Sequence, residues 1–452
     1  MGWSSYRGRH HCVDNISGQQ TNREAVNSSK IEVWSKMKYD VIIIGAGASG
    51  LAAMRKLVQA GLQVCMLEAS HVTGGRIATI DDGFGHPVEA GAEFVHGKLP
   101  LTFKLIKEAK LRYEPVHGKM IGVQNGEWQK DEHDTHWDGF MGELKKLKRD
   151  ITVQQFLDEK FYEGEYLELR RAVQRFAEGF NLADITKASA LSLKDEWKNI
   201  DKTQFRITGG YGQVIKFLYD QCAGTNADFY FNTVVNKINY EKNVVVYTTD
   251  RKKYESWKLI ITVSTGVLQS GSIQFDPPLT RHGLAIQSLG FGGIIKFLLE
   301  FKTRFWESRD TDIGFILTDE IIPTWWTQLP AKSNLLTAWM GGTRATENIF
   351  ETNSSLLQTA MLCLSSIFKI APAVLRDELR NYKIVNWLAH PFVKGGYSYN
   401  TLYSREAKEI LSSPVDDKIY FAGEAVSNSE SQGTVESALH SGYNVAELLL
   451  KQ

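Results

Sequence analysis

A glycine-rich turn, Gly45-Ala46-Gly47-Ala48-Ser49-Gly50, is the first segment of the sequence whose residue spacing points to chemistry. In such a G-x-G-x-x-G turn the first glycine permits a tight bend, the second lets the backbone approach a pyrophosphate, and the third lets a helix pack on a strand. Glu68 follows at the end of the next apolar run, where its carboxylate would accept hydrogen bonds from ribose hydroxyls. An acidic residue there favours an unphosphorylated adenosine ribose, so the pattern predicts FAD or NAD rather than NADP.

The elements predicted around this turn form one βαβ unit. Residues 41–44 are an unbroken β-branched run, typical of a strand buried on both faces. Residues 51–60 have apolar positions at helical spacing and close at Gly61, and residues 63–68 form the second strand. The turn therefore lies where a phosphate would meet the N-terminus of a helix.

Composition fits a globular enzyme of more than one domain. The chain has 452 residues, 43% hydrophobic and 23% charged, against about 150 residues for an average domain. Its 52 Lys and Arg residues balance 52 Asp and Glu residues, which argues against nucleic acid as a main partner. Four cysteines without a C-x-x-C pair predict neither a disulfide framework nor a thiolate metal site, and no metal is expected.

The ends and the apolar runs bear on the compartment. No apolar run approaches the ~18 residues that a membrane-spanning helix needs. The first 36 residues are polar and lack the apolar core of a secretory signal, so residues 1–37 are predicted to be a disordered extension, with Met37 as a plausible alternative start. Together with the few cysteines, this predicts a cytoplasmic protein without a membrane partner.

The rest of the chain divides into segments that differ in composition and in hydrophobic periodicity. Residues 134–202 are rich in Lys and Glu at helical spacing and read as a helical insertion. Strand signals return at residues 228–249 and 259–263, and a mixed segment with aromatic clusters covers residues 274–384. A short strand at residues 419–422 and a helix at residues 434–450 close the chain.

Further motifs identify a family resemblance. Thr73-Gly74-Gly75-Arg76 is followed by Glu89-Ala90-Gly91-Ala92-Glu93-Phe94-Val95-His96-Gly97. From this segment onward the sequence resembles the flavin-dependent amine oxidase superfamily, which includes monoamine oxidases, polyamine oxidases and flavin-dependent histone demethylases. The resemblance covers most of the chain from Lys38, and it recurs in order at Gly209-Gly210, Val235 with Ile238, residues 262–268, Lys296, Trp387, residues 395–398 and residues 421–424.

The resemblance implies which residues would hold FAD. It places Arg76 at the pyrophosphate, where a guanidinium neutralises phosphates with forked donors, and Val235 at the adenine. Glu424 would accept hydrogen bonds from FAD hydroxyls, and the helix start at Thr434 and Val435 would direct free N–H groups at the flavin. The predicted cofactor-binding set is Gly45, Gly47, Ser49, Gly50, Glu68, Gly75, Arg76, Gly91, Ala92, Glu93, Val235, Trp387, Gly423, Glu424, Thr434 and Val435.

Lys296 is the most informative single residue for catalysis. A lysine inside the apolar run of residues 294–299 is costly to bury without partners, although a solvent-facing lysine at a strand edge is the plain alternative. The resemblance places it near flavin N5, holding a water and assisting reoxidation by oxygen. It also implies that Tyr397 and Thr434 flank the substrate amine and that His96 faces the substrate, although a lone histidine is often structural.

Departures from family patterns narrow the substrate. The cysteine that bonds flavin covalently in monoamine oxidases is absent, since Gly395-Gly396 is followed by Tyr397, so FAD should be bound noncovalently. Amino-acid oxidases carry an arginine where Phe94 stands, which argues against amino acids as substrates. Carboxylates such as Glu93 could grip a distal ammonium group, but the sequence leaves the particular amine and the oligomeric state open.

These observations predict an α/β fold: a Rossmann-like FAD-binding domain of the glutathione-reductase type with a second, mixed α+β substrate domain. The first domain is expected to comprise residues 38–115, 206–277 and 384–452, and the second residues 116–205 and 278–383. The predicted enzyme oxidises a primary or secondary amine, including polyamines, and reduces oxygen to hydrogen peroxide.

Three alternatives remain open. One is another flavin oxidoreductase, of the desaturase or porphyrinogen-oxidase type. A second is a non-catalytic flavin-binding protein. The third and least favoured is a chromatin-type demethylase, since no tower-like coiled coil or reader domain occurs in this sequence.

Overall fold

An eight-stranded sheet contains the predicted βαβ unit. Strand β1 (Tyr39–Ile44) pairs in parallel with β2 (Val64–Leu67) on one side and with β13 (Lys253–Ile261) on the other. The order is β10-β2-β1-β13-β12-β11-β14, and β22 also pairs with β13. The remaining strands are β10 (Ala227–Tyr230), β11 (Val235–Asn239), β12 (Val244–Thr248), β14 (Gln274–Asp276) and β22 (Ile419–Phe421). The computed structural model describes residues 39–129, 136–198, 203–428 and 431–451; the predicted extension and Met37 lie outside these ranges.

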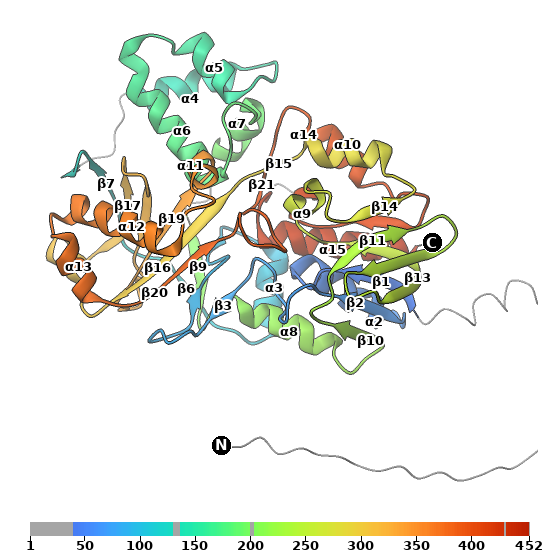
Figure 1. Cartoon of the computed structure of the whole chain (residues 1–452). Helices are drawn as coiled ribbons and strands as arrows, with labels where there is room; N and C mark the ends of the chain where they lie inside the picture. The colour runs from blue at the N-terminus through green and yellow to red at the C-terminus, as the bar shows by residue number, and fades with distance from the viewer. Residues whose placement is uncertain (1–38, 130–135, 199–202, 429–430, 452) are drawn as a thin grey trace, which may run out of the picture. The chain divides into compact units, whose positions relative to one another are not determined.

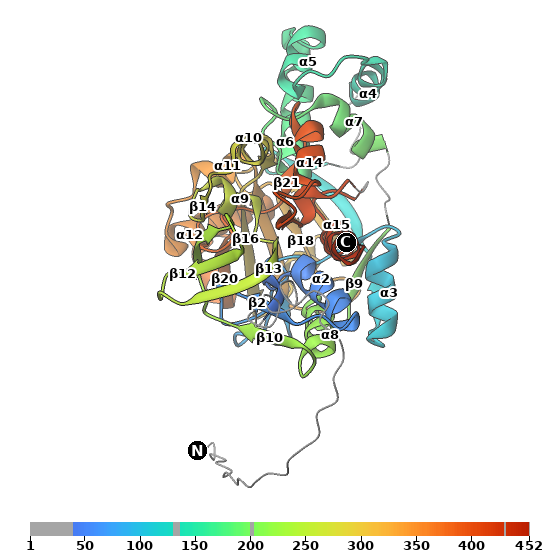
Figure 2. The same cartoon turned by 90° about the vertical axis from the view of Figure 1, so that its right-hand side faces the viewer.

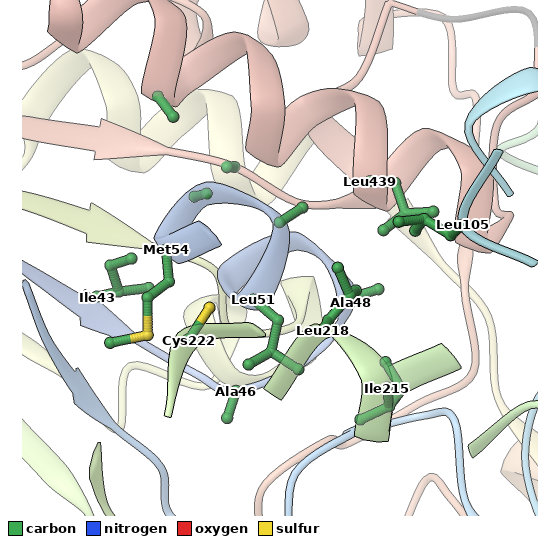
Figure 3. Packing of buried hydrophobic residues seen from close by; sticks show 14 of the residues in the cluster. Ile43, Ala46, Ala48, Leu51, Met54, Leu105, Ile215, Leu218, Cys222 and Leu439 are labelled. Carbon is green, nitrogen blue, oxygen red and sulfur yellow. The ribbon is translucent and has the colours of Figure 1, made fainter. Parts of the chain in front are cut away.

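Helices pack on this sheet through apolar faces. The helix after the glycine turn, α2 (Ala48–Gln59), contacts α8 (Gly212–Cys222) and α15 (Val435–Leu450), and α3 (Pro100–Glu108) packs against α15. Figure 3 shows the side chains of Leu51 and Met54 from α2 gathered with Leu218 and Cys222 from α8, all fully buried. Burial of this apolar surface fixes the start of α2 at the edge of the sheet.

The second large sheet of the structure has seven strands. Its order is β20-β16-β19-β18-β17-β7-β8, and β16 (Ile294–Phe301) is buried along its whole length. Ile295, Phe297 and Leu299 alternate on the face that packs with α12 (Asn353–Phe368), so Lys296 points to the opposite face. The other strands are β7 (Lys119–Gln124), β8 (Glu127–Trp128), β17 (Ile313–Thr318), β18 (Thr324–Trp326), β19 (Leu335–Gly341) and β20 (Leu379–Asn386).

Four helices form the predicted insertion. They are α4 (Trp137–Lys146), α5 (Val153–Lys160), α6 (Leu167–Asn181) and α7 (Ala190–Lys198), and both views show them gathered together (Figures 1 and 2). Aromatic side chains fill their core: the rings of Phe140 and Phe156 have centroids 5.7 Å apart, and those of Phe176 and Trp197 lie 5.0 Å apart. The helical pattern predicted for residues 134–202 therefore corresponds to four helices packed around a common apolar core.

Shorter elements connect these parts. Small sheets are formed by β3 (Thr79–Ile80) with β4 (Val88–Glu89), by β5 (Val95–His96) with β9 (Gln204–Ile207) and β6 (Tyr113–Pro115), and by β15 (Gly290–Phe291) with β21 (Ser398–Tyr399). The remaining α-helices are α9 (Thr265–Gln269), α10 (Thr280–Ser288), α11 (Thr343–Glu347), α13 (Pro372–Glu378) and α14 (Ser404–Leu411). Single turns of 3-10 helix lie at Gly164–Tyr166, Phe305–Ser308 and Glu424–Val426.

The two large sheets follow the predicted division of the chain closely. All strands of the eight-stranded sheet lie in residues 38–115, 206–277 and 384–452, whereas β20 crosses the predicted boundary at residue 384. Residues 38–452 form one compact unit, and the two-domain division stays a prediction.

The longest described helices, α12 and α15, have 16 residues each. Within the described ranges, no single helix is long and apolar enough to cross a membrane. The helices α12 and α13 meet the length and composition criteria only together, and they are bent by 111° at the break between them.

The contact between α15 and α2 gives a test of this packing. A Cβ atom at Gly442 in α15 would lie 2.1 Å from the backbone oxygen of Ser49 in α2. We expect Gly442→Ala to lower the free energy of unfolding by about 1–3 kcal/mol, measured by urea denaturation, because the helices must separate. Gly283→Ala in α10 is the control: its nearest neighbour would be Leu279 Cβ at 3.9 Å, so helix propensity should stabilise it slightly. Equal losses in both variants would contradict this account.

Candidate active site

The glycine turn forms an open cradle at the start of α2. A Cβ atom at Gly47 would meet no described atom closer than 3.9 Å, whereas one at Gly50 would lie 2.0 Å from the Gly45 carbonyl oxygen. The second glycine thus leaves room for a ligand, and the third is required by close packing. The hydroxyl of Ser49 is buried with no hydrogen-bond partner among the described residues, and it lines the cavity beside the helix N-terminus. An anion placed there would meet this donor and free backbone N–H groups.

The carboxylate of Glu68 is fixed at the end of β2. Its Oε2 accepts a hydrogen bond from the backbone N of Ala46 at 2.7 Å, and its Oε1 accepts one from the backbone N of Ser70 at 2.8 Å. Each oxygen keeps a further lone pair for a ligand hydroxyl. The geometry therefore fits a ribose contact next to the glycine cradle.

One cavity of about 2350 Å³ runs from this cradle to the seven-stranded sheet. Ligand pockets for small molecules are typically about 300–1,000 Å³, so this one has room for a dinucleotide and a substrate. Of the predicted site residues, all of which the structure describes, Gly50 alone does not line it. The lining residues predicted from sequence are Gly45, Gly47, Ser49, Glu68, Gly75, Arg76, Gly91, Ala92, Glu93, His96, Val235, Lys296, Trp387, Tyr397, Gly423, Glu424, Thr434 and Val435.

Arg76 and Glu424 bond each other within the cavity wall. Arg76 Nη1 donates to Glu424 Oε1 at 2.8 Å and to the carbonyl oxygen of Gly396 at 2.7 Å. Glu424 Oε2 accepts from the hydroxyl of Ser398 at 2.6 Å. The ligand contact that the resemblance implies for Glu424 stays a prediction; the structure shows that its carboxylate bonds Arg76 and thereby orients the guanidinium.

The segment that carries the predicted Gly91 and Ala92 contacts is held by its neighbours. Trp387 Nε1 donates to the carbonyl oxygen of Ala90 at 2.9 Å, and the backbone N of Ala92 donates to the carbonyl oxygen of Arg76 at 2.9 Å. A Cβ atom at Gly91 would lie 2.0 Å from that Arg76 oxygen. This glycine therefore serves close backbone packing next to the cavity.

Lys296 lies in the interior of its sheet and not at an edge. Its strand β16 is paired on both sides, with Trp339 and Val385 opposite the lysine. The Nζ atom donates to Glu93 Oε2 at 2.8 Å and to the carbonyl oxygen of Gly91 at 3.0 Å. The lysine side chain is only 3% exposed, so its cost of burial is offset by these partners.

Glu93 joins Lys296 to two residues that sequence reasoning had not singled out. Its Oε1 accepts from Arg206 Nε at 3.0 Å and from Trp326 Nε1 at 2.9 Å. Burial by itself would raise the pKa of Glu93, but the charges of Lys296 and Arg206 outweigh burial and hold the pKa below its ordinary value. Two cations thus share one carboxylate at the cavity wall. We call Glu93, Lys296, Arg206 and Trp326 the buried ion cluster.

Aromatic residues line the cavity around the cluster. The ring of Trp339 lies 5.6 Å from that of Trp326 and 6.5 Å from that of Tyr397. Tyr397 donates its hydroxyl to the carbonyl oxygen of Phe180 at 2.7 Å, which fixes its ring, and burial raises its pKa. Thr434 uses its hydroxyl to accept from the backbone N of Ser437 as the N-cap of α15, so its methyl group remains for ligand contact.

His96 faces the same part of the cavity. It has no hydrogen-bond partner within the described part of the chain, and its ring lies 5.8 Å from that of Phe94 and 6.2 Å from that of Phe180. Burial lowers its pKa to about 4, so the imidazole is neutral at physiological pH. A neutral ring nitrogen there is free to bond a substrate group.

A second carboxylate, Glu196 of α7, lines the cavity and was not predicted. It accepts a hydrogen bond from Asn181 Nδ2 at 2.6 Å, and burial raises its pKa to about 7. The sequence placed it in a charged helix without marking one glutamate from another. Among the described residues, no three His, Cys, Asp or Glu side chains are grouped as metal ligands.

Known proteins resemble this chain along most of its length. Lysine-specific histone demethylase 2 of Homo sapiens is 28% identical over 444 residues, which are 90% of this chain and 53% of the demethylase. Probable polyamine oxidase 4 of Arabidopsis thaliana is 27% identical over 469 residues, which are 94% of this chain and 89% of that protein. The chain spans about half the length of the human and mouse demethylases that it matches.

Solved structures share the fold. A putrescine oxidase, the wild type bound to putrescine, has a TM-score of 0.75 at 20% identity, covering 92% of this chain and 99% of that chain. Cyclohexylamine oxidase from Brevibacterium oxydans IH-35A also has a TM-score of 0.75, at 21% identity, covering 92% of this chain and 100% of that one. At such identities the likeness concerns the fold alone.

The family model decides the relationship. The model of the flavin containing amine oxidoreductases matches residues 48–450, a range that holds α2, both large sheets apart from β1, and the buried ion cluster. The predicted resemblance is therefore confirmed over most of the sequence, and flavin is the expected cofactor. This chain belongs to the flavin-containing amine oxidoreductase family.

Proposed function

We propose that this protein is an FAD-dependent amine oxidase that converts a primary or secondary amine to an imine, which water hydrolyses to an aldehyde. The observation that carries the proposal is the single cavity that joins a phosphate cradle to an aromatic wall containing Lys296. Oxygen would be the electron acceptor, so each turnover consumes one amine, one oxygen and one water and gives one hydrogen peroxide.

The described residues fit FAD. The open cradle at Gly47 and the unpartnered hydroxyl of Ser49 suit the pyrophosphate together with Arg76, and Glu68 suits the ribose. We propose noncovalent binding, because none of the three described cysteines, Cys65, Cys222 and Cys363, lines the cavity. A Rossmann-like domain of the glutathione-reductase type remains our proposal for the part that binds it.

Bound FAD would supply the oxidation of the amine, and the protein would orient and desolvate the substrate. The rings of Tyr397 and Trp339 form apolar walls on which an amine-bearing carbon can lie, with His96 available as a neutral hydrogen-bond partner. Burial of this wall favours the neutral form of the amine, whose lone pair must be free to react. Turnover should therefore rise with pH toward the pKa of the bound amine.

We further propose a substrate with more than one ammonium group. Glu196 lines the cavity beside the aromatic wall and keeps one carboxylate oxygen for a distal cation. The cavity lining holds eight carboxylates, Asp138, Glu165, Glu168 and Asp319 among them, against four Lys or Arg side chains, and this excess of negative charge would attract polycations. The names of the polyamine oxidase and putrescine oxidase relatives agree with this substrate class. A cytoplasmic location also remains a proposal.

A lysine demethylase is the second candidate, since a demethylase of Homo sapiens is 28% identical to this chain. A methylated lysine side chain is also a secondary or tertiary amine, so the two functions share their chemistry. A different flavin oxidoreductase and a non-catalytic flavin-binding protein are the remaining alternatives.

Anaerobic reduction of the flavin tests the proposal directly. The purified protein is expected to be yellow, and its oxidised-flavin absorbance should disappear on adding spermine, acetylated spermine or putrescine. Benzylamine, leucine and a dimethyl-lysine peptide serve as comparison substrates. Bleaching by the peptide alone would replace the polyamine assignment with the demethylase one, and a yellow protein that no amine bleaches would overturn amine oxidation.

Lys296→Met tests the role of the lysine in reoxidation. We expect the variant to retain FAD, since methionine fills the same apolar strand, and to react with oxygen roughly tenfold or more slowly because a preorganised charge is lost. Stopped-flow mixing of amine-reduced protein with oxygen measures this rate. Unchanged oxygen kinetics would remove Lys296 from the reaction.

The raised pKa of Glu196 leads us to expect a preference for diamines that depends on pH. Because burial raises its pKa to about 7, its carboxylate becomes charged as the pH rises through 7, and binding of a distal ammonium should strengthen. The ratio of KM for a diamine to KM for a monoamine of equal length should fall between about pH 6 and pH 8. Glu196→Gln should flatten this ratio and raise the diamine KM about tenfold. A ratio that changes equally with pH in both proteins would contradict the assignment.

A further inference from the structure

We propose that Glu93 is a positioning residue: its carboxylate fixes the direction of the Lys296 ammonium group and sets the net charge of the cavity wall against which the flavin ring lies. The inference rests on the proposed function only for the identity and placement of the flavin. The contacts that carry it belong to the protein itself.

The position of the flavin ring follows from the two ends of the cavity. Glu68 and Val235 line the end near the glycine cradle, where the adenosine and pyrophosphate fit. The other half of a dinucleotide must extend along the cavity, toward the wall lined by Lys296, Trp339 and Tyr397. The buried ion cluster is therefore part of the surroundings of the ring.

Every polar atom of Glu93 is committed to holding other groups. Its two oxygens accept three hydrogen bonds, from Lys296, Arg206 and Trp326, at 2.8–3.0 Å, and its side chain is 5% exposed. Three protein donors and low exposure thus favour a role in holding neighbouring groups, whereas the sequence had left open that Glu93 grips a distal ammonium group. Its contacts make it a connector between charged residues.

The same contacts restrict Lys296. Two of its three ammonium protons are donated to Glu93 Oε2 and the Gly91 carbonyl oxygen, which leaves one for a group in the cavity. The Nζ atom also lies 5.4 Å from the centroid of the Trp326 ring. A long and flexible side chain is thereby held in one direction before any ligand arrives.

Arg206 is held as firmly as Lys296. Besides Glu93, it donates to the carbonyl oxygens of Thr327 and Leu329, and its guanidinium stacks 4.7 Å from the centroid of the Phe94 ring. One further carboxylate interacts with the cluster: Glu89, which accepts from the backbone N of Tyr211 at 2.5 Å. Burial raises the pKa of Glu89 to about 7, and the Lys296 charge opposes that rise.

A flavin gains negative charge on reduction, so its midpoint potential depends on the charges near its ring. Each substitution is therefore expected to shift the potential according to the charge that it removes. Positive charge near the ring stabilises the reduced form and makes the midpoint potential more positive. Glu93→Gln removes a negative charge and leaves both cations, whereas Lys296→Met removes one cation. The double variant loses one charge of each sign and regains the net charge of the wild type.

The test measures the flavin midpoint potential by photoreduction with a reference dye, which needs no amine substrate. We expect a more positive potential in Glu93→Gln, a more negative one in Lys296→Met, and a value near the wild type in the double variant. At about pH 8.5, above the pKa of Glu89 in the wild type, that carboxyl is mainly ionised. Because loss of the Lys296 charge would raise its pKa further, the potentials of all variants are compared at several pH values above 8. Apoprotein titration with FAD, followed by flavin fluorescence, should show that all variants still bind it.

Glu300→Gln is the matched control. Glu300 is a buried carboxylate on the same strand, about 13 Å from residue 296 at strand spacing; it accepts from the backbone N of Gly85 at 2.8 Å and does not line the cavity. Its substitution should leave the potential unchanged.

Two results would overturn the inference: a shift in the same direction in Glu93→Gln and Lys296→Met, or a shift in Glu300→Gln as large as that in Glu93→Gln. If Glu93→Gln is too unstable to hold flavin, the double variant is compared with Lys296→Met, from which it differs only at Glu93. A more positive potential in the double variant supports the inference, and equal potentials refute it. Failure of every amine to bleach the wild type would count against the proposed function alone, because these potentials do not depend on it.

Discussion

The ion pair between Glu93 and Lys296 is the interaction on which the arrangement of this molecule depends. Glu93 lies between β4 and β5, and Lys296 lies in β16, an interior strand of the seven-stranded sheet. Because both groups are buried, removing either partner would leave the charge of the other less compensated in an apolar interior. The pair therefore joins the segment between β4 and β5 to strand β16 and places charge at the wall of the cavity.

Two further residues bond the carboxylate of this ion pair. Arg206 supplies a second cation from β9, and Trp326 supplies an indole donor from β18, so the four partners come from four separate parts of the chain. At the other end, Glu424 orients Arg76 in the same way, through a carboxylate that bonds protein donors. Both buried carboxylates thus bond a neighbouring cation that lines the cavity.

This organisation separates two tasks along one cavity. The glycine cradle, Ser49 and Glu68 present donors and acceptors in fixed positions and would bind the cofactor without contact to the substrate. The aromatic wall and Glu196 line the part of the cavity that we propose for the substrate, where apolar surface would favour a neutral reacting amine and a carboxylate would favour a distal cation.

The sequence by itself determined the βαβ unit, the family and a set of site residues of which all but Gly50 line the cavity. These depend on local rules: β-branched runs form buried strands, glycine spacing follows turn geometry, and the helix at α15 shows its period directly. It also marked Lys296, because a lysine in an apolar run demands partners. Only the tertiary structure identified the residues that Lys296 and its carboxylate partner bond. Glu93, Arg206 and Trp326 are far apart in sequence, and ordinary charged or aromatic residues carry no local sign of pairing. For the same reason Glu196 could not be told from its neighbours in α7 until folding buried it, since burial, and not residue type, raises its pKa.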